Sequence, residues 1–283
     1  MIWIIGVETT YETQRILQEL NRSRIDYRFL GWNDVILPFE EIPRLCLFRA
    51  PPPGLRRLYV PYMLSVMEEL ERQNCATIPS SKALSKCDKL STYLLWKRHL
   101  AHHVKMPETI TTLNLDVALR FLKRSETVVF KPIIGGRGIG IELIQENEEE
   151  NLKLLHKEHG ILYLQKFISN PGYDIRTLVI GEDIASQYVR YNPEAFRHNL
   201  YQGAVPLTVG RAKEIDTKVE EYAKQSKELA LKAKEIFSLE MFAIDTLPST
   251  EQELYFLEIN ALFGFKGPKE NIARMIVNHL EKY

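Results

Sequence analysis

The sequence predicts an α/β (α+β) protein in three parts: an open α/β region, a small central α+β unit and a C-terminal α+β unit. Three observations support this. Short β-branched runs alternate with helical patterns in the opening region, two strands enclose a glycine-rich turn near the middle, and two strands with a polar turn between them precede the last helix. The expected boundaries are 1–85, 86–168 and 169–283.

The opening region has the pattern of a small open α/β layer. Strands are expected at 1–7, 24–30, 44–49 and 76–79, and helices at 10–20 and 59–73. Pro51, Pro52, Pro53 and Gly54 indicate a loop, because successive prolines fix the backbone and remove hydrogen-bond donors.

The rest of the chain alternates strands and helices. In the central unit, helices are expected at 88–99, 114–124 and 148–159, and strands at 127–132, 139–144 and 161–167. The C-terminal unit should contain strands at 175–180, 185–190, 243–247 and 254–259, with helices at 216–237 and 269–281. No fixed-period repeat is present, which argues against a solenoid.

Charge and composition exclude several classes of protein. Thirty-seven basic residues balance thirty-seven acidic ones, so no overall field attracts nucleic acid. No apolar run approaches the roughly 20 residues that span a bilayer, and the apolar start lacks a basic leader. Three cysteines without a C-x-x-C pair favour a reducing compartment. We expect a cytoplasmic protein without nucleic-acid or membrane partners.

The sharpest local feature is the segment from Val128 to Gly140, in which Lys131 precedes a glycine-rich turn. Glycines let the backbone approach a polyphosphate and direct N–H groups toward it. The segment is neither a P-loop nor a Rossmann fingerprint, because a strand and not a helix is expected after the glycines. Taken alone, it fits a nucleotide loop and a tight structural hairpin equally well.

A second feature is a group of polar side chains on two neighbouring strands near the C-terminus. Glu258 and Asn260 share one strand face, with Leu257 and Ile259 expected on the other, and Asp245 can join the polar face from the antiparallel neighbour. Two carboxylates and an amide oxygen are ligands that suit Mg²⁺. A solvated polar sheet face remains the alternative for the trio in isolation.

A third feature is the polar loop at 194–204, which contains Arg197 and Asn199. The planar guanidinium of Arg197 suits phosphate oxygens, since it offers two donors in a fixed geometry. By itself the segment is also compatible with an ordinary surface loop.

In this order, the segments resemble the ATP-grasp superfamily, in the branch of ribosomal-protein-S6-modifying (RimK-like) α-L-glutamate and amino-acid ligases. The resemblance runs from about Lys82 to His279 and implies an ATP-grasp fold, with ATP between the central and C-terminal units. The carriers are Cys87-Asp88-Lys89, Phe130-Lys131-Pro132 with its glycine loop, Leu164 to Ile168, Asp174-Ile175-Arg176, Phe196 to Leu200, Asp245 and Leu257 to Asn260.

The resemblance implies a set of nucleotide-binding residues, one group for each part of ATP. The set is Lys89 and Lys131 at the phosphates or base, Gly135, Gly136 and Gly138 in the loop over the triphosphate, Gln165, Lys166 and Phe167 along the adenine, and Asp174 on the ribose side.

The resemblance also implies a metal site and two catalytic residues. Asp245, Glu258 and Asn260 would hold Mg²⁺ or Mn²⁺, while Arg197 and Asn199 would stabilise phosphoryl and acyl-phosphate charge. The sequence departs from the family pattern twice. Lys166 stands where an acid is usual in the nucleotide hinge, and Leu262-Phe263 replace the common Ser-Pro on the substrate side.

The implied activity is an ATP- and Mg-dependent carboxylate–amine ligase that works through an acyl phosphate. Its implied substrates are a small acidic coenzyme or peptide and L-glutamate or another amino acid, and the family allows a homo-oligomer. No protein nucleophile is needed for this chemistry. A non-catalytic ATP-binding regulatory module and a phosphotransferase of the same fold are the alternatives.

Overall fold

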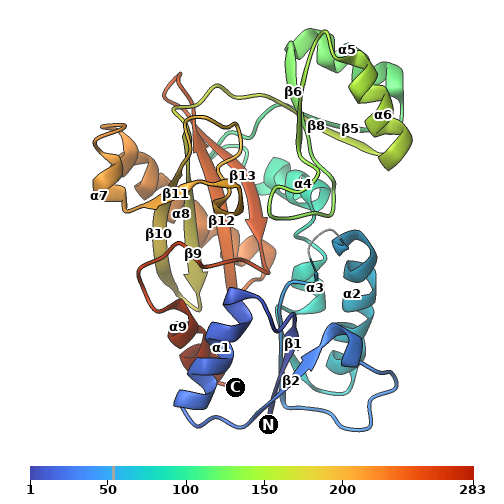
Figure 1. The fold of residues 1–283 in the computed structure, drawn as a ribbon, viewed down its shortest axis with the longest axis vertical. Coiled ribbons are helices and arrows are strands. Elements are labelled where there is room, and N and C mark those ends of the chain that lie inside the picture. The colour runs from blue at the N-terminus through green and yellow to red at the C-terminus, as the bar shows by residue number, and fades with distance from the viewer. Residues whose placement is uncertain (53–54) are drawn as a thin grey trace.

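The structure, a computed structural model describing residues 1–52 and 55–283, is built on three β-sheets (Figure 1). The first sheet is parallel, and its strands in spatial order are β2 (Tyr27–Gly31), β1 (Ile2–Gly6), β3 (Leu45–Phe48) and β4 (Ala76–Ile78). Its helices are α1 (Tyr11–Arg22), α2 (Arg56–Arg72) and α3 (Ser81–Leu84), with a 3₁₀ turn, η1, at Trp32–Asp34. The expected α/β layer is confirmed, while Pro53 and Gly54 of the expected loop lie outside the described residues.

Strand β1 is buried on both faces, which explains its continuous apolar sequence. Ile2 and Ile4 pack in a core with α1 and the last helix, α9 (Ile272–Leu280). Trp3 and Ile5 pack in a second core with α2 and the long helix α8 (Val219–Phe237). Both cores also contain side chains of the five-stranded sheet, so the first and second sheets share their interior.

The second sheet is antiparallel and carries most of the C-terminal part of the chain. Its strands in order are β11 (Val205–Leu207), β10 (Asp183–Tyr191), β9 (Tyr173–Ile180), β12 (Met241–Pro248) and β13 (Leu254–Asn260). The short helix α7 (Val209–Ala212) and a 3₁₀ turn, η2 (Leu200–Gln202), flank β11. Strand β11 was not expected from the sequence. It is a three-residue edge strand that contains Pro206, and prolines occur on edge strands because they cannot donate a hydrogen bond to the ladder.

The third sheet forms a separate small unit, seen at the upper right of Figure 1. Its antiparallel strands in order are β5 (Thr109–Thr112), β8 (Leu162–Lys166), β6 (Thr127–Phe130) and β7 (Glu142–Gln145). Helices α5 (Leu115–Ser125) and α6 (Glu149–His159) pack on it around a core of its own, and α4 (Lys89–His99) precedes it. Asn114 caps α5 as predicted, accepting from two backbone N–H groups.

Several predicted element boundaries need correction. The strand expected at 24–30 and the helix expected at 216–237 begin three residues late, at Tyr27 and Val219, and the helix expected at 59–73 begins three residues early, at Arg56. The strand expected at 139–144 begins at Glu142, because Gly138 and Gly140 adopt positive φ angles of 73° and 70° and residues 137–140 form a turn. The last helix begins at Ile272, three residues after its predicted start, with Asn271 as its cap. No helix of the described chain is long and apolar enough to cross a membrane.

Candidate active site

A cavity of about 870 Å³, its open mouth included, lies between the small sheet and the five-stranded sheet. We call it the glycine-loop cavity. Most predicted site residues line it: Lys89, Lys131, Gly136, Gly138, Gln165, Lys166, Phe167, Asp174, Arg197, Asn199, Asp245 and Glu258. Gly135 and Asn260 line neighbouring cavities, so the structure gathers the predicted set in one region.

Lys131 lies just after β6, where it faces the acidic side chains of β12 and β13. The surrounding protein lowers its pKa to about 8, because desolvation outweighs the opposing effect of the Glu258 carboxylate. Lys89 lowers this pKa further, and Asp245 raises it. These couplings place two lysines and two carboxylates within electrostatic range of one another.

Asp245 is buried and ion-paired. Its two carboxylate oxygens accept from Nε and Nη2 of Arg176 at 2.7 and 2.6 Å, and Nη2 of Arg190 lies 3.0 Å from Oδ2. Burial opposes ionisation of Asp245, but the two guanidinium groups hold its pKa well below the ordinary value. Asp245 is therefore a fixed negative charge.

Glu258 and Asn260 converge on Asp245. Nδ2 of Asn260 donates to Oε1 of Glu258 at 3.2 Å and lies 3.5 Å from Oδ2 of Asp245. No group of three or more His, Cys, Asp or Glu side chains able to hold a metal occurs in the described residues. The trio has two carboxylates and an amide, a set of hard oxygen donors that fits Mg²⁺ when further oxygens come from a phosphate.

A β-bulge in β13 corrects one expectation about this strand. The ladder pairs Asp245 with Glu258 and then Thr246 with Phe256, which leaves Leu257 as the extra residue. Leu257 consequently lines the glycine-loop cavity together with Glu258, although strict alternation placed it on the opposite face. The bulge brings an apolar and an acidic side chain into the same cavity.

The glycine-rich turn contacts the predicted catalytic loop. Nη1 of Arg197 donates to the carbonyl oxygens of Gly138 and Ile141 at 3.2 and 3.4 Å. A Cβ atom on Gly138 would lie 2.8 Å from Oδ1 of Asn199, and the φ angle of 73° is one that glycine adopts more readily than other residues. Arg197 and Asn199 thus border the turn expected to cover a triphosphate.

The far end of the cavity suits a nucleobase. Gln165 is buried, and its Nε2 donates to Oγ1 of Thr109 at 3.0 Å and to the Tyr163 hydroxyl at 3.2 Å. Its Oε1 has no hydrogen-bond partner among the described residues, and a buried acceptor of this kind needs a donor. Val129 and Leu257 supply apolar wall. The exocyclic amino group and flat ring of adenine fit these features.

Asp174 and His198 lie beside Arg190 in the buried wall of the cavity. Both oxygens of Asp174 accept from Arg190, at 2.6 and 2.5 Å, and the ribose contact assigned to Asp174 stays a prediction. His198 is buried beside this pair. Burial, aided by Arg190, lowers its pKa to about 4, and its Nε2 has no partner in the described part of the chain. Sequence reasoning gave no role to His198, Arg176 or Arg190, although all three lie in or near the quoted motifs.

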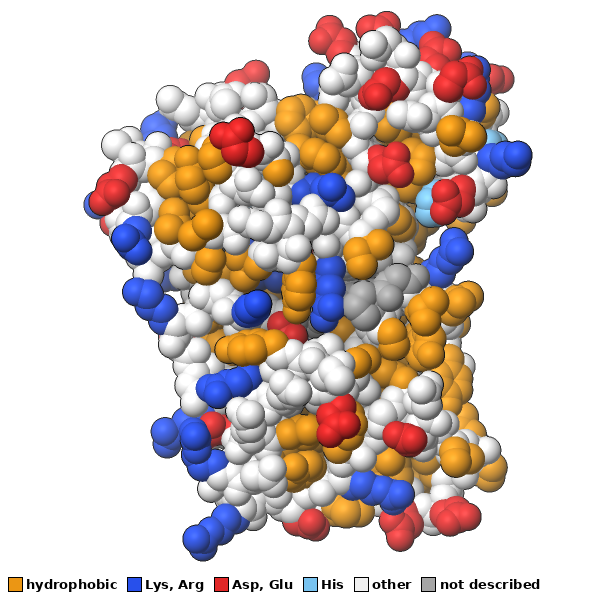
Figure 2. Space-filling view, in the orientation of Figure 1, with side chains coloured by type: hydrophobic (Ala, Val, Ile, Leu, Met, Phe, Trp, Pro, Cys, Tyr) orange, Lys and Arg blue, Asp and Glu red, His pale blue; other side chains and the backbone are white. Residues whose placement is uncertain are grey.

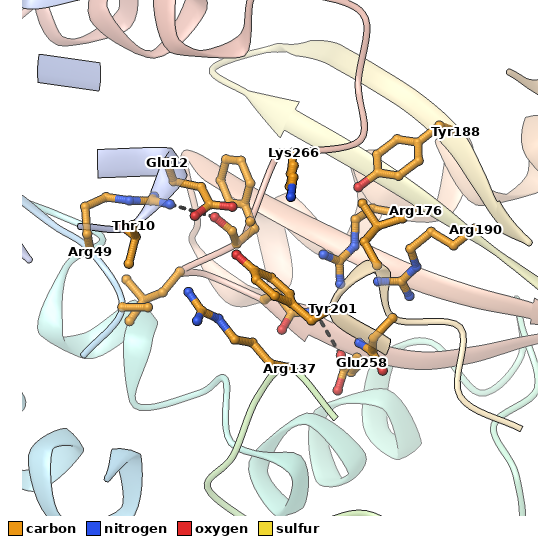
Figure 3. Close-up of a pocket in the computed structure, with 17 residues that line it drawn as sticks. Thr10, Glu12, Arg49, Arg137, Arg176, Tyr188, Arg190, Tyr201, Glu258 and Lys266 are labelled. Carbon is orange, nitrogen blue, oxygen red and sulfur yellow. Dashed lines mark hydrogen bonds between the residues drawn. The ribbon is translucent and has the colours of Figure 1, made fainter. Parts of the chain in front are cut away.

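A second cavity, of about 750 Å³ with its open mouth, adjoins the first, and Glu258 lines both (Figure 3). We call it the arginine cavity. Five basic and two acidic side chains line it: Arg49, Arg137, Arg176, Arg190, Lys266, Glu12 and Glu258. Figure 2 shows Lys and Arg side chains around the middle of the molecule's face. The arrangement suits an anionic ligand next to the predicted metal trio.

Comparison with known proteins identifies relatives along nearly the whole chain. A family model for the RimK-like ATP-grasp domain matches residues 87–280. The glutamate–LysW ligase ArgX of Sulfurisphaera tokodaii is 27% identical over 284 residues, covering 96% of this chain and 94% of that protein. The tetrahydromethanopterin:α-L-glutamate ligase of Methanocaldococcus jannaschii is 27% identical over 300 residues, covering 99% and 98%.

Solved structures show the same architecture. The crystal structure of D-cycloserine synthetase DcsG superposes with a TM-score of 0.73, covering 100% of this chain and 99% of that one at 14% identity. At this identity the likeness concerns the fold alone, and together with the match to the RimK-like ATP-grasp family it confirms the architecture predicted from the sequence.

Proposed function

Because the chain belongs to the RimK-like ATP-grasp family and is an amino-acid ligase of that family, we propose that it joins a carboxylate to the amino group of L-glutamate or another amino acid, using ATP and Mg²⁺ or Mn²⁺. The names of its relatives support glutamate as the amine. The carboxylate belongs to a small acidic coenzyme or to a peptide. We also propose the domain boundaries 1–85, 86–168 and 169–283.

In this proposal the glycine-loop cavity holds ATP. Adenine lies against Val129 and Leu257, with its amino group donating to the unpartnered Oε1 of Gln165. Lys89 and Lys131 bind the phosphates, and the glycine turn covers them. The negative charge of ATP favours protonated Lys131 and so offsets the effect of desolvation on its pKa.

Asp245, Glu258 and Asn260 would hold the metal ion, which would supply positive charge beside the phosphates. The substrate carboxylate oxygen forms a bond to the γ-phosphorus as the bond to the ADP oxygen breaks. Arg197 and Asn199 stabilise the charge on the transferred group. The amine nitrogen then attacks the acyl carbon, phosphate leaves, and the nitrogen loses a proton to give the amide.

One observation carries the proposal: Lys131 is electrostatically coupled to Asp245 and Glu258 across a cavity that contains nearly every predicted nucleotide contact. The test is ADP release in the presence of ATP, Mg²⁺, L-glutamate and a panel of acidic coenzymes and peptides, with hydroxylamine as a second amine that traps activated carboxylates. A ligase releases ADP and phosphate together only when both carboxylate and amine are supplied.

Two other outcomes would contradict the ligase. Accumulation of a stable phosphorylated product with ADP, without any need for an amine, would indicate a phosphotransferase. Nucleotide binding without turnover across the whole panel would indicate a regulatory module.

A further inference from the structure

Glu12 is a buried carboxylate in the wall of the arginine cavity that the proposed function does not yet use. It lies in the first turn of α1 and is 4% exposed. Its Oε1 has no hydrogen-bond partner in residues 1–52 and 55–283. A buried carboxylate oxygen without a donor is costly, so such a group commonly marks a site where a ligand supplies the donor.

The fold makes room for this carboxylate. The loop after β13 passes close to α1, and a Cβ atom on Gly264 would lie 2.9 Å from Oε1 of Glu12. Glycine at this position lets Glu12 keep its place at the cavity wall. Figure 3 shows Glu12 and Arg49 on one side of the cavity and Arg176 and Arg190 on the other.

The charges around the cavity define the ligand that fits. Arg176 and Arg190 are engaged with Asp245 and Asp174, but Lys266 is exposed at the rim. A ligand must therefore present anionic groups to the basic side chains and a cationic donor to Glu12. A zwitterionic amino acid with an additional carboxylate has this combination.

We propose that Glu12 receives the ammonium group of the amino-acid substrate, and so selects α-amino dicarboxylic acids over their deaminated counterparts. This inference rests on the proposed function, because it names the receptor of the incoming amine. Since Glu258 lines both cavities, an amine held near Glu12 lies in the cavity adjoining the predicted site of phosphoryl transfer.

The test is calorimetric titration of L-glutamate and of glutarate, which lacks the amino group, into the full-length protein saturated with Mg²⁺ and a non-hydrolysable ATP analogue. Wild type should bind L-glutamate about 10- to 100-fold more tightly than glutarate, as expected for a hydrogen bond between charged groups. Glu12→Gln should bring the two affinities within about threefold by weakening L-glutamate binding, since it removes the charge and keeps the shape.

Glu19→Gln is the matched control, because Glu19 is a buried glutamate of the same helix that pairs with Arg22 at 3.1 Å and lines neither cavity. It should keep the wild-type preference. If Glu12→Gln fails to fold, Glu12→Asp keeps the charge and should retain part of the preference. Equal affinities in wild type, no binding of either ligand, or an undiminished preference in Glu12→Gln would overturn the inference. Failure to bind the ATP analogue would instead contradict the proposed function.

Discussion

The two cavities are built from differently connected parts of the molecule. The glycine-loop cavity lies between the small sheet, which has a hydrophobic core of its own, and the five-stranded sheet. The arginine cavity draws most of its residues from α1, the end of β3 and the five-stranded sheet, which share two cores, and takes Arg137 from the glycine-rich turn of the small unit. Parts with separate cores move relative to one another more readily than parts with a common interior. We therefore expect the small sheet to move as a unit and to carry Arg137 with it, while the rest of the arginine cavity keeps its shape.

The largest expected effect concerns Lys131. Replacing it with methionine should reduce ADP release by about 10²–10³-fold, because a positioned charge at the phosphates is lost. Steady-state ADP release with saturating carboxylate and amine measures this. Lys123→Met, on the exposed face of α5 where Lys123 pairs with Glu149 at 3.1 Å, is the control and should retain wild-type activity. Full activity in Lys131→Met would contradict the proposed role of Lys131 in binding the phosphates.

Asp245→Asn should reduce the free energy of unfolding by about 3–5 kcal/mol, because Arg176 and Arg190 lose a buried partner. Urea denaturation measures the change. Asp116→Asn, at an exposed position in the first turn of α5, should change the free energy of unfolding by less than about 1 kcal/mol. Equal midpoints for the two variants would show that the ion pairs contribute little to stability.

Two core substitutions test whether the small sheet is stabilised independently of the parts that share the two larger cores. Ile276→Ala in α9 and Leu122→Ala in α5 should each cost about 2–5 kcal/mol of local or global stability. In hydrogen exchange, Ile276→Ala should lower protection in both α1 and β9, whereas Leu122→Ala should lower it only within residues 109–166. Identical patterns for the two variants would mean that the small unit is not independent.

The smallest expected effect is on the pH dependence of nucleotide affinity. The free protein's Lys131 has a pKa of about 8, below the ordinary lysine value, so it loses its proton as pH rises through this value. Because ATP prefers the protonated form, its dissociation constant should rise above pH 8 by at most about tenfold per pH unit. Fluorescence titration between pH 6.5 and 9.5 measures this, and Lys131→Met should give a flat profile.

The sequence predicted most helices and strands whose capping residues and apolar periodicity lie within one continuous segment. The helix after Asn114 was predicted because its cap and apolar stripe lie within one segment. Strand β5 was missed, since its four residues carry little periodicity and acquire their strand character from pairing with β8. The turn at 137–140 was read partly as strand because Ile139 and Ile141 look β-like, whereas the positive φ angles of neighbouring glycines decide the conformation.

The candidate site was predictable where motifs mark it and hidden where tertiary structure creates it. Lys131, Asp245 and Glu258 stand in recognisable strand motifs, and the structure brings them together. Glu12 has no such signal, because a glutamate in the first turn of a helix usually serves the helix dipole. Only the packing of α1 against the loop containing Gly264 places it at a cavity wall.

Leu257 is the unpaired residue of the bulge, so its deletion would shorten β13 without changing which residues of β12 and β13 pair. A chain lacking this residue would still pair Asp245 with Glu258 and Thr246 with Phe256. In the proposed site, only the apolar side chain would be lost from the cavity wall, while Asp245, Glu258 and Asn260 would keep their places. If the proposed site is right, deleting Leu257 would weaken recognition of the purine and leave binding of the divalent ion unchanged, although the two depend on adjacent residues of one strand.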